Sequence, residues 1–317
     1  MPSNYEVALT RAELNAGVLQ TWLNRQVLEN LEPELFFYNA GKKPDTPAGY
    51  NTVGWAKFTK VDEDSVTIGD STTDGVTPTA IDFDATVITC TPAQHRVVIS
   101  LADMTIELNV LNFLAGAAKA IADAMARSID KAIQTVIMAG THVIYGGTAA
   151  SRTAVADADV LTAAKLNMAS TLLDSRFAKK IGGYFMAYAH PYVIWDLRNE
   201  SGSGNWLEVS KYAAPENIFK GEIGMLSGIR IVMAPFIKSF SSTVTVYPTL
   251  VLGMDAYGVS TFQALKSYVT PATSSDSDPL AQRRKVGSKV AFATKILEED
   301  NMIRIETGAT ASTWTIV

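Results

Sequence analysis

The most regular hydrophobic pattern of the chain lies in residues 109–140, an alanine-rich stretch without proline. Its apolar residues recur every three or four positions, which is the spacing of one face of an α-helix. About thirty residues at 1.5 Å each predict a helix about 45 Å long, and Gly140 is suited to end it. Residues 5–31 repeat Leu, Val and Trp at the same spacing before Pro33. The pattern therefore predicts a long central helix and a helical N-terminal arm.

Residues 52–100 alternate apolar and polar side chains, which is the pattern of β-strands. A polar stretch rich in Asp, Ser, Thr and Gly interrupts the alternation, so we expect one long hairpin with an elaborate tip. A two-stranded ribbon has too little core to be stable alone. It should therefore lie on the rest of the chain or on a neighbouring molecule. A loop containing Pro and Gly, residues 41–51, joins the arm to this hairpin.

Beyond residue 140 the expected helices and strands do not alternate regularly. A strand at 142–145 precedes a helix at about 159–174 capped by Asp157 or Asp159, a strand at 184–189 and a helix that begins at Pro191. Further strands are expected at 229–235, 243–259, 285–297 and 301–306, with loops at 201–205 and 271–280. This order favours an α+β fold over a doubly wound parallel sheet.

Composition narrows the class of protein only modestly. The 317 residues are 47% hydrophobic and 19% charged, as in a globular protein of one or two domains. A net charge of -5 excludes an overall basic field that would attract nucleic acid or an anionic membrane. The single cysteine, Cys90, fits a reducing cytoplasm. We expect neither a signal peptide nor a membrane span, because charges interrupt the apolar stretch 110–138.

Three glycines with a preceding lysine, in residues 211–235, raise the question of a phosphate-binding loop. Such loops run from a strand through a glycine turn into a helix, whose N–H groups face the phosphate. Here the expected order is helix, glycines, strand, so the donors would point the wrong way. We interpret Gly221, Gly224 and Gly228 as turn positions at which a side chain would disturb the backbone.

Candidate catalytic and metal-binding residues are few. His190 lies near Asp196 and Arg198 in sequence, and could act as a base held by a carboxylate. The simpler interpretation is a hydrogen-bonded residue at a strand-to-helix junction. The three histidines lack the spacing of a metal site, and the acidic run at 62–64 lacks a calcium-binding frame. We expect no catalytic residue, cofactor or metal, and keep a soluble α+β enzyme using His190 as a remote alternative.

Several segments together resemble the major capsid proteins of tailed bacteriophages, specifically the N4-type family with the Hong Kong 97 capsid fold. They are GKKPDTPAGYNTVGW (41–55), MAGTHVIYGGTAASR (138–152), HPYVIWDLR (190–198), KYAAPENIFKGEIGMLSGIRIV (211–232), LVLGMDAYGV (250–259) and DPLAQRRKVGSKVAFATKILEEDNMIRIE (278–306). The resemblance implies an N-terminal arm (1–50), an extended hairpin called the E-loop (51–100), a peripheral domain (101–154 and 261–317) with spine helix 109–140, and an axial domain (155–260).

The resemblance also implies a role in assembly. Hexamers and pentamers of the chain would form an icosahedral shell around double-stranded DNA in the virion, made in the bacterial host cytoplasm and without sequence-specific DNA binding. We expect a separate scaffolding protein and a portal, and a decoration protein is compatible with the pattern. An encapsulin-like compartment shell is the alternative with the same fold. The predicted assembly interface consists of apolar hairpin residues: Trp55, Phe58, Val61, Val66, Ile68, Ile81 and Phe83.

Overall fold

The structure, a computed structural model, describes residues 37–44, 52–58, 84–102, 113–200, 222–270 and 279–314. The predicted arm helix at 5–31 and the hairpin tip lie outside the described residues. The helices are α2 (Phe37–Ala40), α4 (Phe113–Ile137), α5 (Ala163–Ser175) and α6 (Pro191–Asn199). The strands are β1 (Val53–Phe58), β2 (Ala85–Cys90), β3 (Ala93–Ala102), β4 (Val143–Tyr145), β5 (Phe185–Ala189), β6 (Glu222–Leu226), β7 (Ile229–Met233), β8 (Phe240–Ser241), β9 (Thr245–Leu252), β10 (Tyr257–Thr270), β11 (Arg283–Ile296) and β12 (Met302–Thr307).

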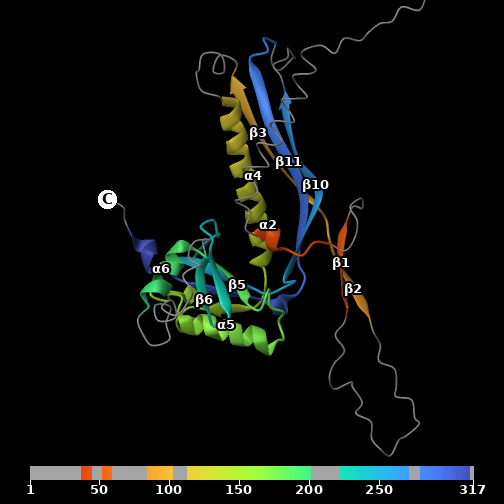
Figure 1. Ribbon diagram of the computed structural model, residues 1–317. Coiled ribbons are helices and arrows are strands. Elements are labelled where there is room, and N and C mark those ends of the chain that lie inside the picture. The colour runs from red at the N-terminus through yellow and green to blue at the C-terminus, as the bar shows by residue number, and fades with distance from the viewer. Residues whose placement is uncertain are drawn as a thin grey trace, which may run out of the picture.

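Helix α4 packs along one face of a three-stranded antiparallel sheet with the order β10-β11-β3 (Figure 1). Its buried side chains include Ile121, Met125, Ile129 and Ile133, spaced four residues apart. They meet Val286, Val290 and Phe292 of the sheet in one hydrophobic cluster. The predicted long helix is thus confirmed over Phe113–Ile137, because its apolar stripe has a sheet face to cover.

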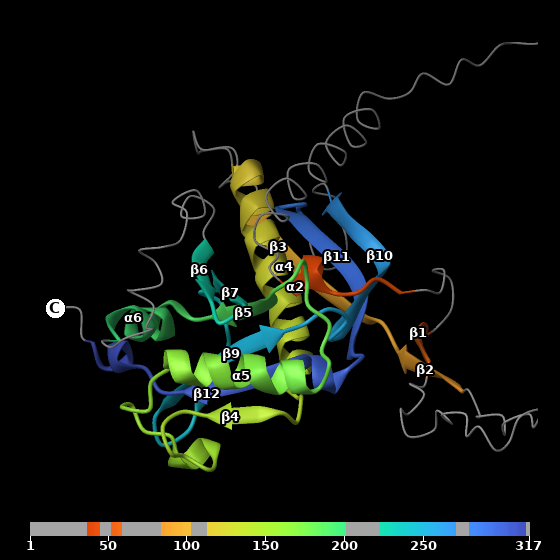
Figure 2. The same cartoon turned by 60° about the horizontal axis from the view of Figure 1, so that its bottom comes forward.

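A second, seven-stranded sheet has the order β4-β12-β9-β5-β7-β6, with β8 paired to β9. Its strands are partly parallel, as in β4 with β12 and β5 with β7, and partly antiparallel. Helix α5 lies across this sheet (Figure 2), and its Leu166 and Leu173 share a hydrophobic cluster with Phe185 and Ile305 of the strands. The mixture of helices and mixed sheets confirms the predicted α+β class.

The start of helix α5 differs from the prediction. Thr162 caps the helix, because its Oγ1 accepts the Lys165 N–H at 3.4 Å. Asp157 and Asp159 were the predicted caps, and both precede the helix by several residues. The Asp159 carboxylate instead accepts the Ala156 N–H at 2.8 Å. A side chain that binds the backbone of its own turn is not available to cap a later helix.

The predicted hairpin over residues 51–100 includes too many residues at its C-terminal end, because the paired ribbon ends at Cys90. Strands β1 and β2 pair antiparallel from Val53 opposite Cys90 to Phe58 opposite Ala85. Strand β3 leaves the ribbon and pairs with β11 instead. Pro92 lies between β2 and β3, and it has no N–H to continue a ladder, so the change of partner falls there.

The two sheets also divide the C-terminal strands differently from the predicted domains. Within the segment 261–317, assigned above to the peripheral domain, β11 joins the three-stranded sheet but β12 pairs with β9 in the seven-stranded sheet. Residues 260–270, for which the pattern gave no strand, continue β10 to Thr270. Every residue of β12 is buried, because hydrophobic clusters cover both faces of the strand, with Met302 in one and Ile303 and Ile305 in the other.

Candidate functional site: the base of the projecting hairpin

The β1–β2 ribbon leaves the side of the molecule beside β10 and β11 (Figure 1). Its anchor is Trp55, of which only 1% is exposed and which clusters with Val53 and Ala293. Gly258 of β10 lies directly beneath the indole, where a Cβ would come within 2.5 Å of the Trp55 Cε2 atom. The glycine therefore provides the space in which the tryptophan fixes the ribbon to the body.

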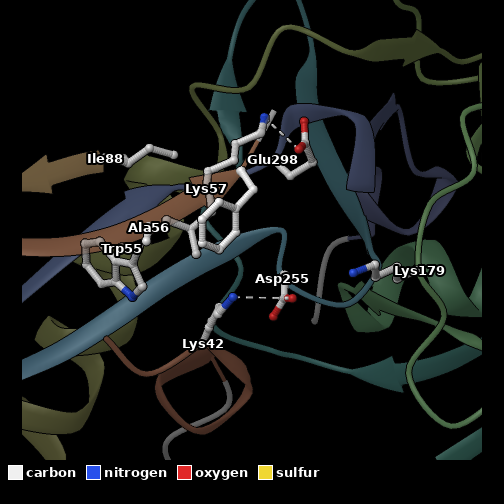
Figure 3. Close-up of a pocket in the computed structure, with 10 residues that line it drawn as sticks. Lys42, Trp55, Ala56, Lys57, Ile88, Lys179, Asp255 and Glu298 are labelled. Atoms are coloured by element: carbon white, nitrogen blue, oxygen red, sulfur yellow. Dashed lines mark ion pairs between the residues drawn. The ribbon is translucent and has the colours of Figure 1, made fainter. Parts of the chain in front are cut away.

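Polar contacts surround this anchor. The Lys57 Nζ lies 2.7 Å from the Glu298 Oε2, and the Lys42 Nζ lies 3.6 Å from the Asp255 Oδ2 (Figure 3). The Cys90 Sγ donates to the Thr294 carbonyl at 3.3 Å. The joint thus combines one buried aromatic ring with ion pairs at its rim.

The same residues border an open cavity of about 290 Å³ beside the ribbon. Its lining is Lys42, Trp55, Ala56, Lys57, Phe58, Ile88, Lys179, Asp255, Leu297 and Glu298. Two of the three lysines are paired with the two carboxylates, so the opposite charges largely offset one another. This lining presents no nucleophile next to a base, and its form is that of a joint between ribbon and body.

The ribbon has one covered and one open face. Trp55 and Ile88 lie opposite each other toward the body, whereas Phe58 and Val87 lie on the other face and are 60% and 59% exposed. Of the predicted interface residues, Phe58 is therefore at the surface and Trp55 is inside the chain. Val61, Val66, Ile68, Ile81 and Phe83 lie outside the described residues. Val87 was missed, although the period-two alternation of β2 places it beside Phe58.

A buried ionic cluster joins the end of helix α4 to the seven-stranded sheet. Glu306 is fully buried and accepts from Arg152 Nε at 2.8 Å, Arg152 Nη2 at 2.6 Å and Arg304 Nε at 2.7 Å. The hydrogen bonds that Arg152 donates to Glu306 raise the pKa of Arg152. Arg304 also donates to the carbonyls of Met138 and Gly140, just beyond the helix. Cations at a helix C-terminus satisfy its free carbonyls.

His190 is a junction residue, as the simpler interpretation predicted. It is the N-cap of α6, and its Nδ1 accepts the Tyr192 N–H at 3.2 Å. Burial lowers the pKa of its imidazole, which lies 4.8 Å from the Tyr247 ring. Asp196 accepts the Thr310 N–H at 3.0 Å, a partner far along the chain. Among the described residues, no group of three or more His, Cys, Asp and Glu is arranged to bind a metal ion.

The glycine-containing stretch forms a hairpin turn. Strands β6 and β7 pair antiparallel, with Leu226 opposite Ile229, so Ser227 and Gly228 make a two-residue turn. Gly228 has a φ of 74°, a region that favours glycine. The prediction of a turn at Gly224 was wrong: this residue lies within β6, at an irregularity in its pairing with β7, and has a φ of 139°. Gly221 lies outside the described residues. Because strand follows strand here, the Gly228 turn does not present a helix N-terminus to a phosphate.

Comparison with solved structures identifies the fold. The chain superposes on the capsid of Ralstonia phage GP4 with a TM-score of 0.67, at 14% sequence identity over 87% of this chain and 92% of that one. The Cyanophage Pam1 capsid superposes with a TM-score of 0.65, at 13% identity over 82% of this chain and 86% of that one. The mature capsid of bacteriophage PhiM1 superposes with a TM-score of 0.59, at 14% identity over 86% of this chain and 87% of that one. The fold is therefore that of tailed-phage capsid proteins, the Hong Kong 97 type predicted from the sequence.

A sequence comparison also points to phage capsid proteins. Residues 117–250 match the model of a family described as phage capsid protein. No curated protein matches the chain. The predicted resemblance to tailed-phage major capsid proteins is thereby confirmed, whereas the N4-type subfamily stays a prediction. No helix in the described part of the chain is long and apolar enough to cross a membrane.

Proposed function

We propose that this chain is the repeating subunit of a tailed-phage capsid, that it assembles with copies of itself into a closed shell around double-stranded DNA, and that it acts without catalysis. The observation that carries the proposal is the projecting β1–β2 ribbon, whose open face presents Phe58 and Val87 to the exterior of the monomer. A two-stranded ribbon with an exposed apolar face is stabilised when another surface covers it.

The fold supports an assignment of the described elements to three parts of a capsid subunit. Helix α4 with the β10-β11-β3 sheet corresponds to the peripheral domain, the larger sheet with α5 and α6 to the axial domain, and β1–β2 to the base of the E-loop. The Glu306 cluster connects the first two. Hexamers and pentamers would then form around the axial domains, and each ribbon would extend over a neighbour.

Assembly of this kind draws its stability from many contacts per subunit. A single contact needs only modest affinity, because a closed lattice makes the later contacts effectively intramolecular. The net charge of -5 also suits a container, since a strongly basic shell would hold its DNA tightly. A scaffolding protein and a portal remain expected partners, and the location would be the virion.

Deletion of residues Val61 to Ala80 tests the proposal. Lys60 would then join Ile81, and residues 59, 60 and 81–84 would close a short hairpin on the intact β1–β2 base. The Trp55 anchor is retained, so the subunit should fold with the thermal midpoint of the wild type. We expect electron microscopy to find no closed shells. Shells of normal size and yield from the deleted chain would contradict the role of the hairpin.

A compartment shell that encloses an enzyme is the second candidate, because it shares this fold. The match of residues 117–250 to a phage capsid family supports the phage role over it. The contents of purified shells separate the two: nuclease-protected DNA supports a capsid, and a protein cargo without DNA supports a compartment.

A further inference from the structure

The cavity at the ribbon base lies where three parts of the chain meet. Strands β1 and β2 supply one wall, the link after β11 supplies Leu297 and Glu298, and the loop after α5 supplies Lys179. Small-molecule sites often form where separate parts of a fold meet, and they measure about 300–1,000 Å³. At about 290 Å³, this cavity has the position of such a site and a size at the lower end of that range.

Hydrogen-bond donors outnumber acceptors in this cavity. The Lys42 Nζ lies 3.6 Å from the Asp255 Oδ2, which is too long for a hydrogen bond. Lys179 has no ion-pair partner among the described residues. Figure 3 shows the ammonium groups of Lys42 and Lys179 on either side of the Asp255 carboxylate. Glu298 is already paired with Lys57 at 2.7 Å, so one carboxylate is left for two ammonium groups with three N–H donors each.

Trp55 adds a buried donor to the same lining. The residue is 1% exposed, and its Nε1 has no hydrogen-bond partner in the described part of the chain. Buried polar groups nearly always have a partner, because leaving one without a partner costs free energy. In Figure 3 the indole nitrogen lies on the Lys42 side of the ring. An acceptor bound beside Lys42 would therefore approach this N–H as well.

The remaining walls of the cavity are apolar. They are formed by Ala56, Phe58, Ile88 and Leu297. A water molecule takes about 30 Å³ in the liquid, so the cavity has room for about ten non-hydrogen atoms. The lining thus suits a molecule with one anionic group and an apolar body about the size of a single ring.

We propose that the cavity at the ribbon base binds a small organic anion. Its carboxylate or phosphate would accept hydrogen bonds from Lys42, Lys179 and Trp55, and its apolar body would lie against Phe58 and Leu297. The lining has three lysines and two carboxylates, so the ligand would neutralise one net positive charge. Hydrogen bonds between charged groups are roughly twice as strong as neutral ones. This inference goes beyond the proposed function and does not depend on it.

A bound anion would hold the ribbon against the body. The Lys179 carbonyl accepts the Met254 N–H at 2.7 Å, so the loop after α5 is fixed to the turn after β9 and forms a firm wall. A ligand that binds only the closed joint lowers the open population by a factor of one plus its concentration divided by Kd. At ten times Kd, amide hydrogen exchange of β1 through opening of the joint should slow about tenfold.

Equilibrium dialysis of the full-length chain tests the inference with two probes, benzoate and phenyl phosphate. We expect one saturable site per chain, and the probe that binds more tightly identifies the anionic group. Acetate and inorganic phosphate lack the ring, and benzyl alcohol lacks the charge. Each of these three should bind at least about tenfold more weakly, because it loses either the apolar burial or the charged hydrogen bonds.

A matched pair of lysine variants locates the site. Lys179→Gln should weaken binding at least about tenfold, because it removes a charged hydrogen-bond donor. Lys180→Gln is the control, since Lys180 pairs with Asp174 and lies outside the lining, and it should bind as the wild type does. Equal thermal midpoints of the two variants establish that both are folded. Hydrogen-exchange mass spectrometry of β1 measures the expected slowing in the wild type.

Three results would overturn the inference. They are no saturable binding of either probe, binding that Lys179→Gln leaves unchanged, and equal weakening by Lys180→Gln, which would indicate a general attraction to basic side chains. Dialysis measures binding whether or not shells form. A chain that forms shells but binds neither anion therefore contradicts this inference alone, and a chain that binds the anion but never associates contradicts the proposed function alone.

Discussion

At the scale of single residues, the contact between Trp55 and Gly258 determines how the ribbon is held. A large buried ring packed against a glycine leaves no room for a methyl group, because the added Cβ would meet the ring at 2.5 Å. Two positions 203 apart in sequence thus depend on each other. This pairing is the local reason why the ribbon leaves the body at a defined place.

Gly258→Ala should therefore destabilise the protein by about 1–3 kcal/mol, the usual cost of overpacking a well-filled site. Urea unfolding followed by tryptophan fluorescence measures the change. Gly116→Ala is the matched control, since no atom lies within 4 Å of its added Cβ on helix α4. That control should be neutral or stabilising by up to about 1 kcal/mol. Equal effects of the two substitutions would refute the close-packed joint.

His95 makes stability depend on pH. Its Nδ1 lies 3.2 Å from the Ser128 Oγ and its ring stacks on Phe292, so burial lowers the pKa of His95 below its ordinary 6.5. The unfolded chain then binds the proton more readily than the folded chain. The free energy of unfolding should fall as pH decreases through 6.5 toward the folded-state pKa.

His95→Gln should reduce that fall between about pH 7 and pH 5, because the substituted side chain does not titrate. Urea unfolding at a series of pH values measures the slope for both proteins. Identical slopes for the wild type and His95→Gln would show that another group is responsible.

At the scale of elements, the Glu306 cluster connects the end of helix α4 to the seven-stranded sheet. One carboxylate accepts hydrogen bonds from two guanidinium groups, and one of these also donates to a carbonyl at the end of α4. Removing the charge of one partner leaves the others buried without compensation. The arrangement of helix and sheet should therefore be sensitive to this one side chain.

Glu306→Gln should destabilise the fold by about 3–5 kcal/mol, as is typical for breaking a buried ion pair. Asp174→Asn is the control, because it removes a largely exposed pair with Lys180 and should change stability by less than about 1 kcal/mol. Thermal unfolding by calorimetry compares the two. A loss for Glu306→Gln no larger than that of the control would show that the cluster contributes little.

The elements with a complete local pattern could be predicted from the sequence. Helix α4 has an uninterrupted apolar stripe, and Pro191 with His190 defines the start of α6. Predictions were wrong where the pairing of a strand depends on a partner strand far along the chain. The choice of β3 to pair with β11, and of β12 to pair with β9, depends on residues far along the chain. The cap of α5 was also wrong, because Asp159 binds its own turn.

The candidate site was predictable only in outline. Alternation along β1 indicated a half-covered ribbon, yet it did not say that Trp55 turns inward and Phe58 outward. That distinction depends on the register against β2 and on the space at Gly258, more than 200 residues away.

At the scale of the whole molecule, the chain combines two sheets and their packed helices with surfaces on which large apolar side chains are exposed. The open ribbon face is apolar at Phe58 and Val87, and the sheet face away from α4 exposes Val98 and Tyr268 together with cationic side chains. Neither surface belongs to a cleft with the groups of a catalytic site. Both are accounted for when copies of the chain cover one another in a shell.

Electron microscopy of the full-length chain, expressed alone and together with the scaffolding protein that we expect, tests this account most directly. We expect closed, regular shells in which each density for a subunit has its ribbon extended over a neighbour. Stable monomers under both conditions, at concentrations where capsid proteins assemble, would contradict the account.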